Sequence, residues 1–179
     1  MGLLEVLFGK AEGMEPEVVR PAALAVSGAP DEVLAICSGE LMNMADIPDP
    51  VFAAGAMGMA VGIKPTDGTA YAPVSGVVTL ITGTLHAVGL TTDDGISILI
   101  HLGVDTVNMK GEGFHGFVEK GQRVRAGEPL MTMDLDKIAA AGYSDVAITV
   151  ITNSDAFAEV VPAAAGHVNA GSCVMRVVR

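Results

Sequence analysis

Two histidines, His86 and His101, lie on either side of the turn signal Asp93-Asp94-Gly95. An imidazole with a pKa near 6.5 is largely unprotonated at neutral pH, so one of its ring nitrogens can act as a nucleophile or a ligand. Two such rings close together could perform acid–base chemistry, bind a metal ion, or accept a phosphoryl group on nitrogen. In the last case the second ring could donate a hydrogen bond to the phosphoryl oxygens.

The sequence around these histidines predicts a β-hairpin, because the turn signal separates two β-type runs. With the turn centred on its first two residues, His86 lies directly opposite His101. With the turn centred on its last two residues, the two histidines are diagonal neighbours. In both registers they share one face of the sheet, roughly 5–8 Å apart at Cβ, and Thr84 joins that face.

The residues alternating with His101 predict where its ring points, because one face carries an unbroken apolar row that must face the core: Ile96, Ile98, Ile100 and Leu102. His101 therefore belongs to the other face, which favours a functional ring over a structural core histidine. For phosphoryl transfer, one ring nitrogen should be held as an N–H, for instance by donating to the carbonyl of Gly103, which leaves the other nitrogen free as the nucleophile. A metal site needs three or four ligands and only two are evident, yet the residues alone leave all three chemistries open.

The composition predicts one domain with an aliphatic core. The chain has 179 residues, 50% of them hydrophobic but only 4% aromatic. A net charge of −11 without a Lys/Arg cluster argues against nucleic-acid binding, and no apolar run predicts stable membrane insertion. The distant pair Cys37 and Cys173 matches no metal or redox spacing. We therefore expect reduced thiols and a cytoplasmic protein.

Short β-type runs between turn residues predict an all-β fold: a β-sandwich or barrel-sandwich of mostly antiparallel strands, with at most one or two short helices. One helix is expected within DLDKIAAAGYS (134–144), capped by Asp134 and stopped by Gly142. Residues 1–30 contain several prolines and are expected to form a flexible leader or linker, and residues 31–179 the folded domain.

Two weak internal echoes predict that this domain has two related halves. AICSGEL (35–41) resembles APVSGVV (72–78), and VRAGEPLM (124–131) resembles VNAGSCVM (168–175). Each echo places a glycine turn before a strand, as a pseudo-twofold would require. Chance similarity in a chain rich in Gly, Ala and Val is the alternative.

Several longer motifs are specific enough to indicate a family. They include NMADIPDPVF (43–52), VGIKPTDG (61–68), EKGQRVRAGEPL (119–130) and above all HLGVDTVNMKGEGF (101–114). From Val33 to Arg179 the chain resembles the glucose-type enzyme IIA of the bacterial phosphoenolpyruvate:sugar phosphotransferase system. The resemblance implies the β-sandwich expected above, and a cytoplasmic phosphocarrier.

The resemblance implies a role for each residue near the two histidines. His101 would accept a phosphoryl group on Nε2 from the phosphocarrier protein HPr and pass it to the IIB domain of a sugar permease. His86 would hydrogen-bond the phosphoryl group, Thr84 would hold His86, and the Gly103 carbonyl would orient His101. Regulated metabolic proteins are further expected partners. The residues expected on the docking face are Asp49, Val51, Phe52, Leu99, Asp105 and Val107.

No cofactor is expected to be required, although a zinc ion could bridge His86 and His101 with a carboxylate from a partner. A zinc peptidase on a similar scaffold would need a His-x-His pair, which the sequence lacks. A prosthetic-group carrier is disfavoured because Lys137 falls in the expected helix rather than at a hairpin tip. The remaining alternative is a regulatory or binding module that keeps the fold without transferring phosphate.

Overall fold

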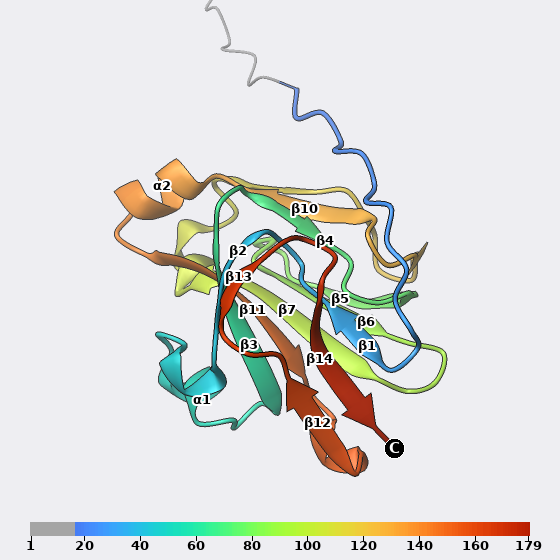
Figure 1. Ribbon diagram of the computed structural model, residues 1–179. Coiled ribbons are helices and arrows are strands. Elements are labelled where there is room, and N and C mark those ends of the chain that lie inside the picture. Colours follow the sequence, from blue (N-terminus) through green and yellow to red (C-terminus); the bar gives the residue numbers. More distant parts are fainter. Residues whose placement is uncertain (1–16) are drawn as a thin grey trace, which may run out of the picture.

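The computed structural model describes residues 17–179, which form three antiparallel sheets (Figure 1). The largest has, in order, β13 (Gly166–Val168), β2 (Gly39–Met42), β3 (Met59–Pro65), β11 (Ser144–Ile151), β7 (Ser97–Val104), β6 (Ala87–Thr91), β5 (Gly76–Ile81) and β9 (Arg123–Val124). The second contains β1 (Glu32–Leu34), β14 (Cys173–Val178) and β12 (Glu159–Pro162). The third contains β4 (Thr69–Tyr71), β10 (Pro129–Met133) and β8 (Phe114–Gly116). The all-β prediction is confirmed.

Two α-helices are described, both short: α1 (Pro50–Ala53) and α2 (Leu135–Ala140). The Asp134 carboxylate accepts from the N–H of Lys137 at 3.1 Å, and Gly142 takes φ 83° after the last turn, so both predicted ends of α2 are correct. Three 3₁₀ turns complete the elements: η1 (Met44–Asp46), η2 (Thr106–Met109) and η3 (Ser154–Ala156). Within residues 17–179, neither helix has the length to cross a bilayer.

One aliphatic core is shared by the three sheets. Strand β7 and the residue before it contribute the row that the sequence analysis placed inside. All four side chains are at most 3% exposed: Ile96, Ile98, Ile100 and Leu102. Strands β10 and β14 cover this row with Leu130, Met131, Val174 and Met175. The inward-facing row of β7 therefore fixes His101 on the other side of the large sheet.

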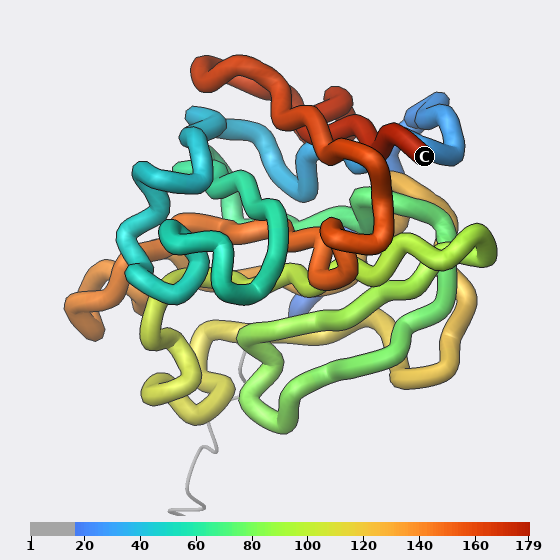
Figure 2. Tube along the Cα trace, turned by 90° about the horizontal axis from the view of Figure 1, so that it is seen from below, coloured from blue at the N-terminus to red at the C-terminus, as the bar shows by residue number. Residues whose placement is uncertain are grey.

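That other side carries a second, smaller apolar cluster under α1. Phe52 of α1 and Ile47 pack there on Ile148 and Val150 of β11, and Leu99 of β7 borders them. The segment around α1 and the segment after β7 lie at the same end of the molecule (Figures 1 and 2). Because β7 runs between the two clusters, its outward residues meet the rim of the second one.

The internal echoes correspond to equivalent backbone positions. The N–H of Gly127 donates to the carbonyl of Ala72 at 2.8 Å, and that of Gly171 to the carbonyl of Ala35 at 2.9 Å. Each alanine N–H in turn donates to the carbonyl of the residue after the glycine, at 2.8 and 2.7 Å respectively. These matching contacts support the prediction of two related halves.

Part of the expected leader lies against these glycine turns. The N–H of Leu24 donates to the carbonyl of Gly127 at 2.9 Å, and a Cβ at Gly171 would lie 2.6 Å from Val26. Residues 1–16 of that leader lie outside the described residues. The boundary at residue 30 stays a prediction.

Candidate functional site

The β6–β7 hairpin has a different register from both predicted ones, since Ala87 and not His86 lies opposite His101. Thr92 N–H donates to the carbonyl of Ile96 at 3.0 Å, so the loop contains the three residues Asp93–Gly95. A loop of three residues shifts the strand pairing by one residue relative to each of the two predicted two-residue turns. Gly95, with φ 92°, takes the left-handed position typical of such loops.

His86 nevertheless lies beside His101, with ring centroids 5.0 Å apart and planes at 74°. It precedes the first residue of β6, so strand alternation does not fix its face. Leu85 before it has a left-handed backbone (φ 55°), and the His86 carbonyl accepts from Leu102 N–H at 2.7 Å. The predicted proximity is correct, but it arises from a turn rather than from cross-strand pairing.

The tautomer of His101 follows from its hydrogen bond to Gly103. Nδ1 lies 2.7 Å from the Gly103 carbonyl oxygen. A carbonyl only accepts, so Nδ1 carries the hydrogen, and Nε2 of the neutral ring keeps its lone pair. Nε2 is the nitrogen from which a nucleophile would attack.

His86 is held through its own Nδ1 by two threonines. Thr84 Oγ1 lies 2.6 Å from this nitrogen, and Thr82 Oγ1 lies 3.3 Å from it. Thr84 is therefore positioned as the sequence analysis expected of a residue that holds His86. Thr82 was missed, because it reaches His86 only across the turn formed by the left-handed Leu85.

Both rings are biased towards the neutral form. Burial lowers the pKa of His101 below its ordinary value of 6.5, against the raising effects of the Gly103 hydrogen bond and of Asp49 and Asp105. Burial also lowers the pKa of His86, and the neighbouring His101 lowers it further. A neutral His101 has a free lone pair at pH 7, as nucleophilic attack requires.

Some of the expected docking residues lie close to His101. The Phe52 ring lies 5.3 Å from the His101 ring between centroids, and Leu99 packs in the same cluster. Val51 and Val107 are 49% and 47% exposed.

The two acidic docking residues differ in their local roles. The Asp49 carboxylate caps α1 by accepting from the N–H groups of Val51 and Phe52, at 2.8 and 3.3 Å. Asp105 is exposed, has a left-handed backbone (φ 60°) and makes no such cap bond. Both carboxylates lie near enough to His101 to raise its pKa, against the larger effect of burial.

The described residues hold no group of three or more His, Cys, Asp or Glu side chains arranged for a metal ion. Zinc at the histidine pair would need a ligand from another molecule, and such a site stays a prediction. Both cysteines are free. Burial raises the pKa of Cys37 to about 12, which makes this thiol unreactive at neutral pH.

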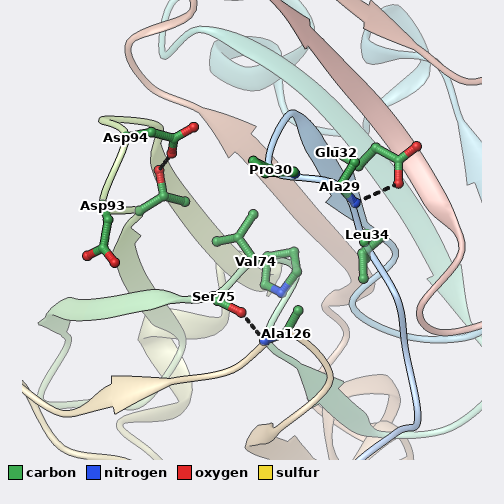
Figure 3. A pocket seen from close by; sticks show the side chains of 12 residues that line it. Ala29, Pro30, Glu32, Leu34, Val74, Ser75, Asp93, Asp94 and Ala126 are labelled. Atoms are coloured by element: carbon green, nitrogen blue, oxygen red, sulfur yellow. Dashed lines mark hydrogen bonds between the residues drawn. The ribbon is translucent and has the colours of Figure 1, made fainter.

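A separate pocket of about 350 Å³ lies beside the hairpin loop and contains no histidine (Figure 3). Its three carboxylates, Glu32, Asp93 and Asp94, are each paired with an arginine: Arg176, Arg123 and Arg179 respectively. Because these charges are already neutralised, the pocket offers no obvious site for an ion. The histidine pair remains the candidate functional site.

Comparison with known proteins agrees with the motifs. Residues 31–157 match the family model described as phosphoenolpyruvate-dependent sugar phosphotransferase system, EIIA 1. The glucose-specific EIIA component of Staphylococcus epidermidis is 37% identical over 153 residues, covering 86% of this chain and 84% of that protein. The solved glucose permease IIA of Mycoplasma capricolum has a TM-score of 0.71 at 33% identity, over 80% of this chain and 93% of that one.

Other relatives are much longer than this chain. The β-glucoside-specific EIIBCA component of Bacillus subtilis is 42% identical over 119 residues, which is 66% of this chain but 20% of the relative. The chain spans about a fifth of the length of such relatives.

Proposed function

The chain belongs to the EIIA 1 family of the phosphoenolpyruvate-dependent sugar phosphotransferase system, and from this premise we propose that Nε2 of His101 carries the phosphoryl group. Members of the family are phosphotransferase components. One observation carries the proposal: the 2.7 Å contact to Gly103 fixes the hydrogen of His101 on Nδ1 and leaves Nε2 free beside a second imidazole.

Attack by Nε2 on the donor's phosphorus forms one N–P bond while the bond from phosphorus to the donor breaks. The ring gains positive character, and the N–H from Nδ1 to the Gly103 carbonyl becomes a stronger, charge-assisted hydrogen bond. The contact therefore orients the ring before transfer and stabilises it afterwards.

His86 donates a hydrogen bond to the same phosphoryl group. With Nδ1 accepting from threonine hydroxyls, its hydrogen is on Nε2 and can be donated to a phosphoryl oxygen. Such a hydrogen bond stabilises the transition state most, because negative charge spreads over the equatorial phosphoryl oxygens during transfer.

We propose HPr as the donor and the IIB domain of a sugar permease as the acceptor. Relatives that combine EIIB, EIIC and EIIA in one chain support a permease partner. Around His101 the surface offers apolar and acidic groups for docking: Asp49, Val51, Phe52, Leu99, Asp105 and Val107. Relatives named for glucose and for β-glucosides both match, so the sugar stays open. We place this exchange in the cytoplasm, as expected from the sequence.

The test is phosphate labelling with phosphoenolpyruvate, enzyme I and HPr. We expect acid-labile label on the wild-type protein and on His115→Ala, whose exposed histidine lies on β8, but none on a folded His101→Ala. Thermal unfolding shows whether each variant folds. Label retained by His101→Ala would refute the assignment, and an unlabelled wild-type chain would favour the regulatory module.

A further inference from the structure

His86 has a second hydroxyl neighbour whose contacts differ from those of Thr84. Thr82 Oγ1 lies 3.3 Å from Nδ1 of His86 and also accepts from the N–H of Ala87 at 3.1 Å. The Thr82 N–H donates to the Ala87 carbonyl at 3.1 Å. Thr82 thus binds both backbone polar groups of Ala87, the residue that follows His86.

The turn between the two threonines makes this arrangement possible. Leu85 N–H donates to the Thr82 carbonyl at 2.9 Å, which closes a tight turn through Gly83 and Thr84. The left-handed Leu85 then directs His86 back towards both side chains. Both hydroxyls consequently converge on the same ring nitrogen.

A hydroxyl has one hydrogen to donate. Since Thr82 Oγ1 already accepts from Ala87 N–H, its own hydrogen can point either to Nδ1 of His86 or to the Ala87 carbonyl, 3.3 Å away. Thr84, at 2.6 Å, is the closer partner of Nδ1. When Nδ1 is unprotonated, its single lone pair can accept from Thr84 and, in a weaker three-centre contact, from Thr82 as well. Both contacts then favour the tautomer with hydrogen on Nε2.

We propose that Thr82 is a positioning residue that, together with Thr84, holds His86 in the tautomer with its hydrogen on Nε2. If the ring becomes protonated, Nδ1–H donates to Thr84 and the Thr82 hydroxyl turns to the Ala87 carbonyl. Thr82 therefore supports the neutral ring selectively, whereas Thr84 can bind both forms. This role rests on the proposed function, because it prepares the Nε2–H that meets the phosphoryl group.

The test compares Thr82→Val, which loses the hydroxyl at nearly constant shape, with Thr82→Ser, which keeps it. Thr79→Val is the matched control, an exposed threonine on β5. Nitrogen-15 NMR of the unphosphorylated protein reports the His86 tautomer, and labelling reports phosphoryl transfer to the IIB domain.

We expect Thr82→Val to move the tautomer ratio towards Nδ1–H by roughly two- to tenfold, the loss of one neutral hydrogen bond. Transfer from His101 should slow to the extent that the fraction of His86 with hydrogen on Nε2 falls, while Thr82→Ser and Thr79→Val stay near the wild type. The proposal would be overturned if Thr82→Val left the tautomer ratio unchanged, or if Thr82→Ser shifted it as much as Thr82→Val does. Failure of His101 to accept phosphate would instead remove the proposed function and leave the tautomer result intact.

Discussion

Gly103 places its carbonyl oxygen 2.7 Å from Nδ1 of His101 because its own backbone is left-handed, with φ 79°. A side chain at this position has no room, since a Cβ would lie 2.3 Å from Thr106 Cγ2 and 2.8 Å from the Ser144 carbonyl oxygen. Thr106 is itself held by its hydroxyl, which donates to the Leu102 carbonyl at 2.5 Å. The orientation of the nucleophile therefore depends on a glycine.

Gly103→Ala is expected to lower the free energy of unfolding by about 2–5 kcal/mol, from the left-handed backbone and the overpacking together. The phosphoryl acceptance rate should fall as well, since the carbonyl must shift. Urea denaturation measures the first effect. Gly121→Ala is the control, because Gly121 also has a positive φ (90°) but nothing within 4 Å of its Cβ position. Equal destabilisation by the two variants would contradict the packing argument.

Asp105→Asn should lower the pKa of His101, because the Asp105 carboxylate favours the charged imidazolium. Asparagine tolerates the left-handed backbone of this position, so the fold is retained. Asp105 is a cleaner choice than Asp49, whose carboxylate also caps α1. The measurement is an NMR titration of His101, with Asp136→Asn on α2 as the control. A His101 titration unaffected by Asp105→Asn would show that this carboxylate does not act on the site.

His86→Gln is expected to accept phosphate on His101 but to pass it on slowly. The amide can still donate a hydrogen bond, but unlike imidazole it cannot carry a proton. Transfer to a IIB domain should fall by roughly 100-fold or more if proton transfer contributes as it does in other enzymes. Single-turnover release of labelled phosphate measures this step, and normal onward transfer would exclude His86 from the mechanism.

The sequence was sufficient for the fold class and for the histidine pair, because both depend on strong local patterns. The alternation Ile96, Ile98, Ile100 placed His101 on the outer face, and Asp134 and Gly142 bounded α2. The hairpin register was wrong because a turn signal does not reveal whether its loop has two residues or three.

Other parts of the site depend on backbone geometry that composition does not encode. A left-handed backbone is uncommon for a residue such as Leu85, so the sequence did not predict the turn that places His86 beside His101. Thr82 was overlooked for the same reason, since it meets His86 only across that turn. The helix α1 could have been located from Asp49-Pro50, a capping residue followed by proline at the first helical position.

The histidine pair should also make stability depend on pH. The pKa of each ring is lower in the folded protein than its ordinary value of 6.5, so the unfolded chain binds more protons below that pH. The free energy of unfolding therefore falls as the pH drops from about 6.5 through the lower folded pKa values, and it is highest above that window.

Urea denaturation between pH 7.5 and pH 5 measures this loss. Replacing His101 with Gln should flatten the profile, whereas replacing the exposed His115 should leave it unchanged; an equal loss of stability in all three proteins would assign the pH dependence to other groups.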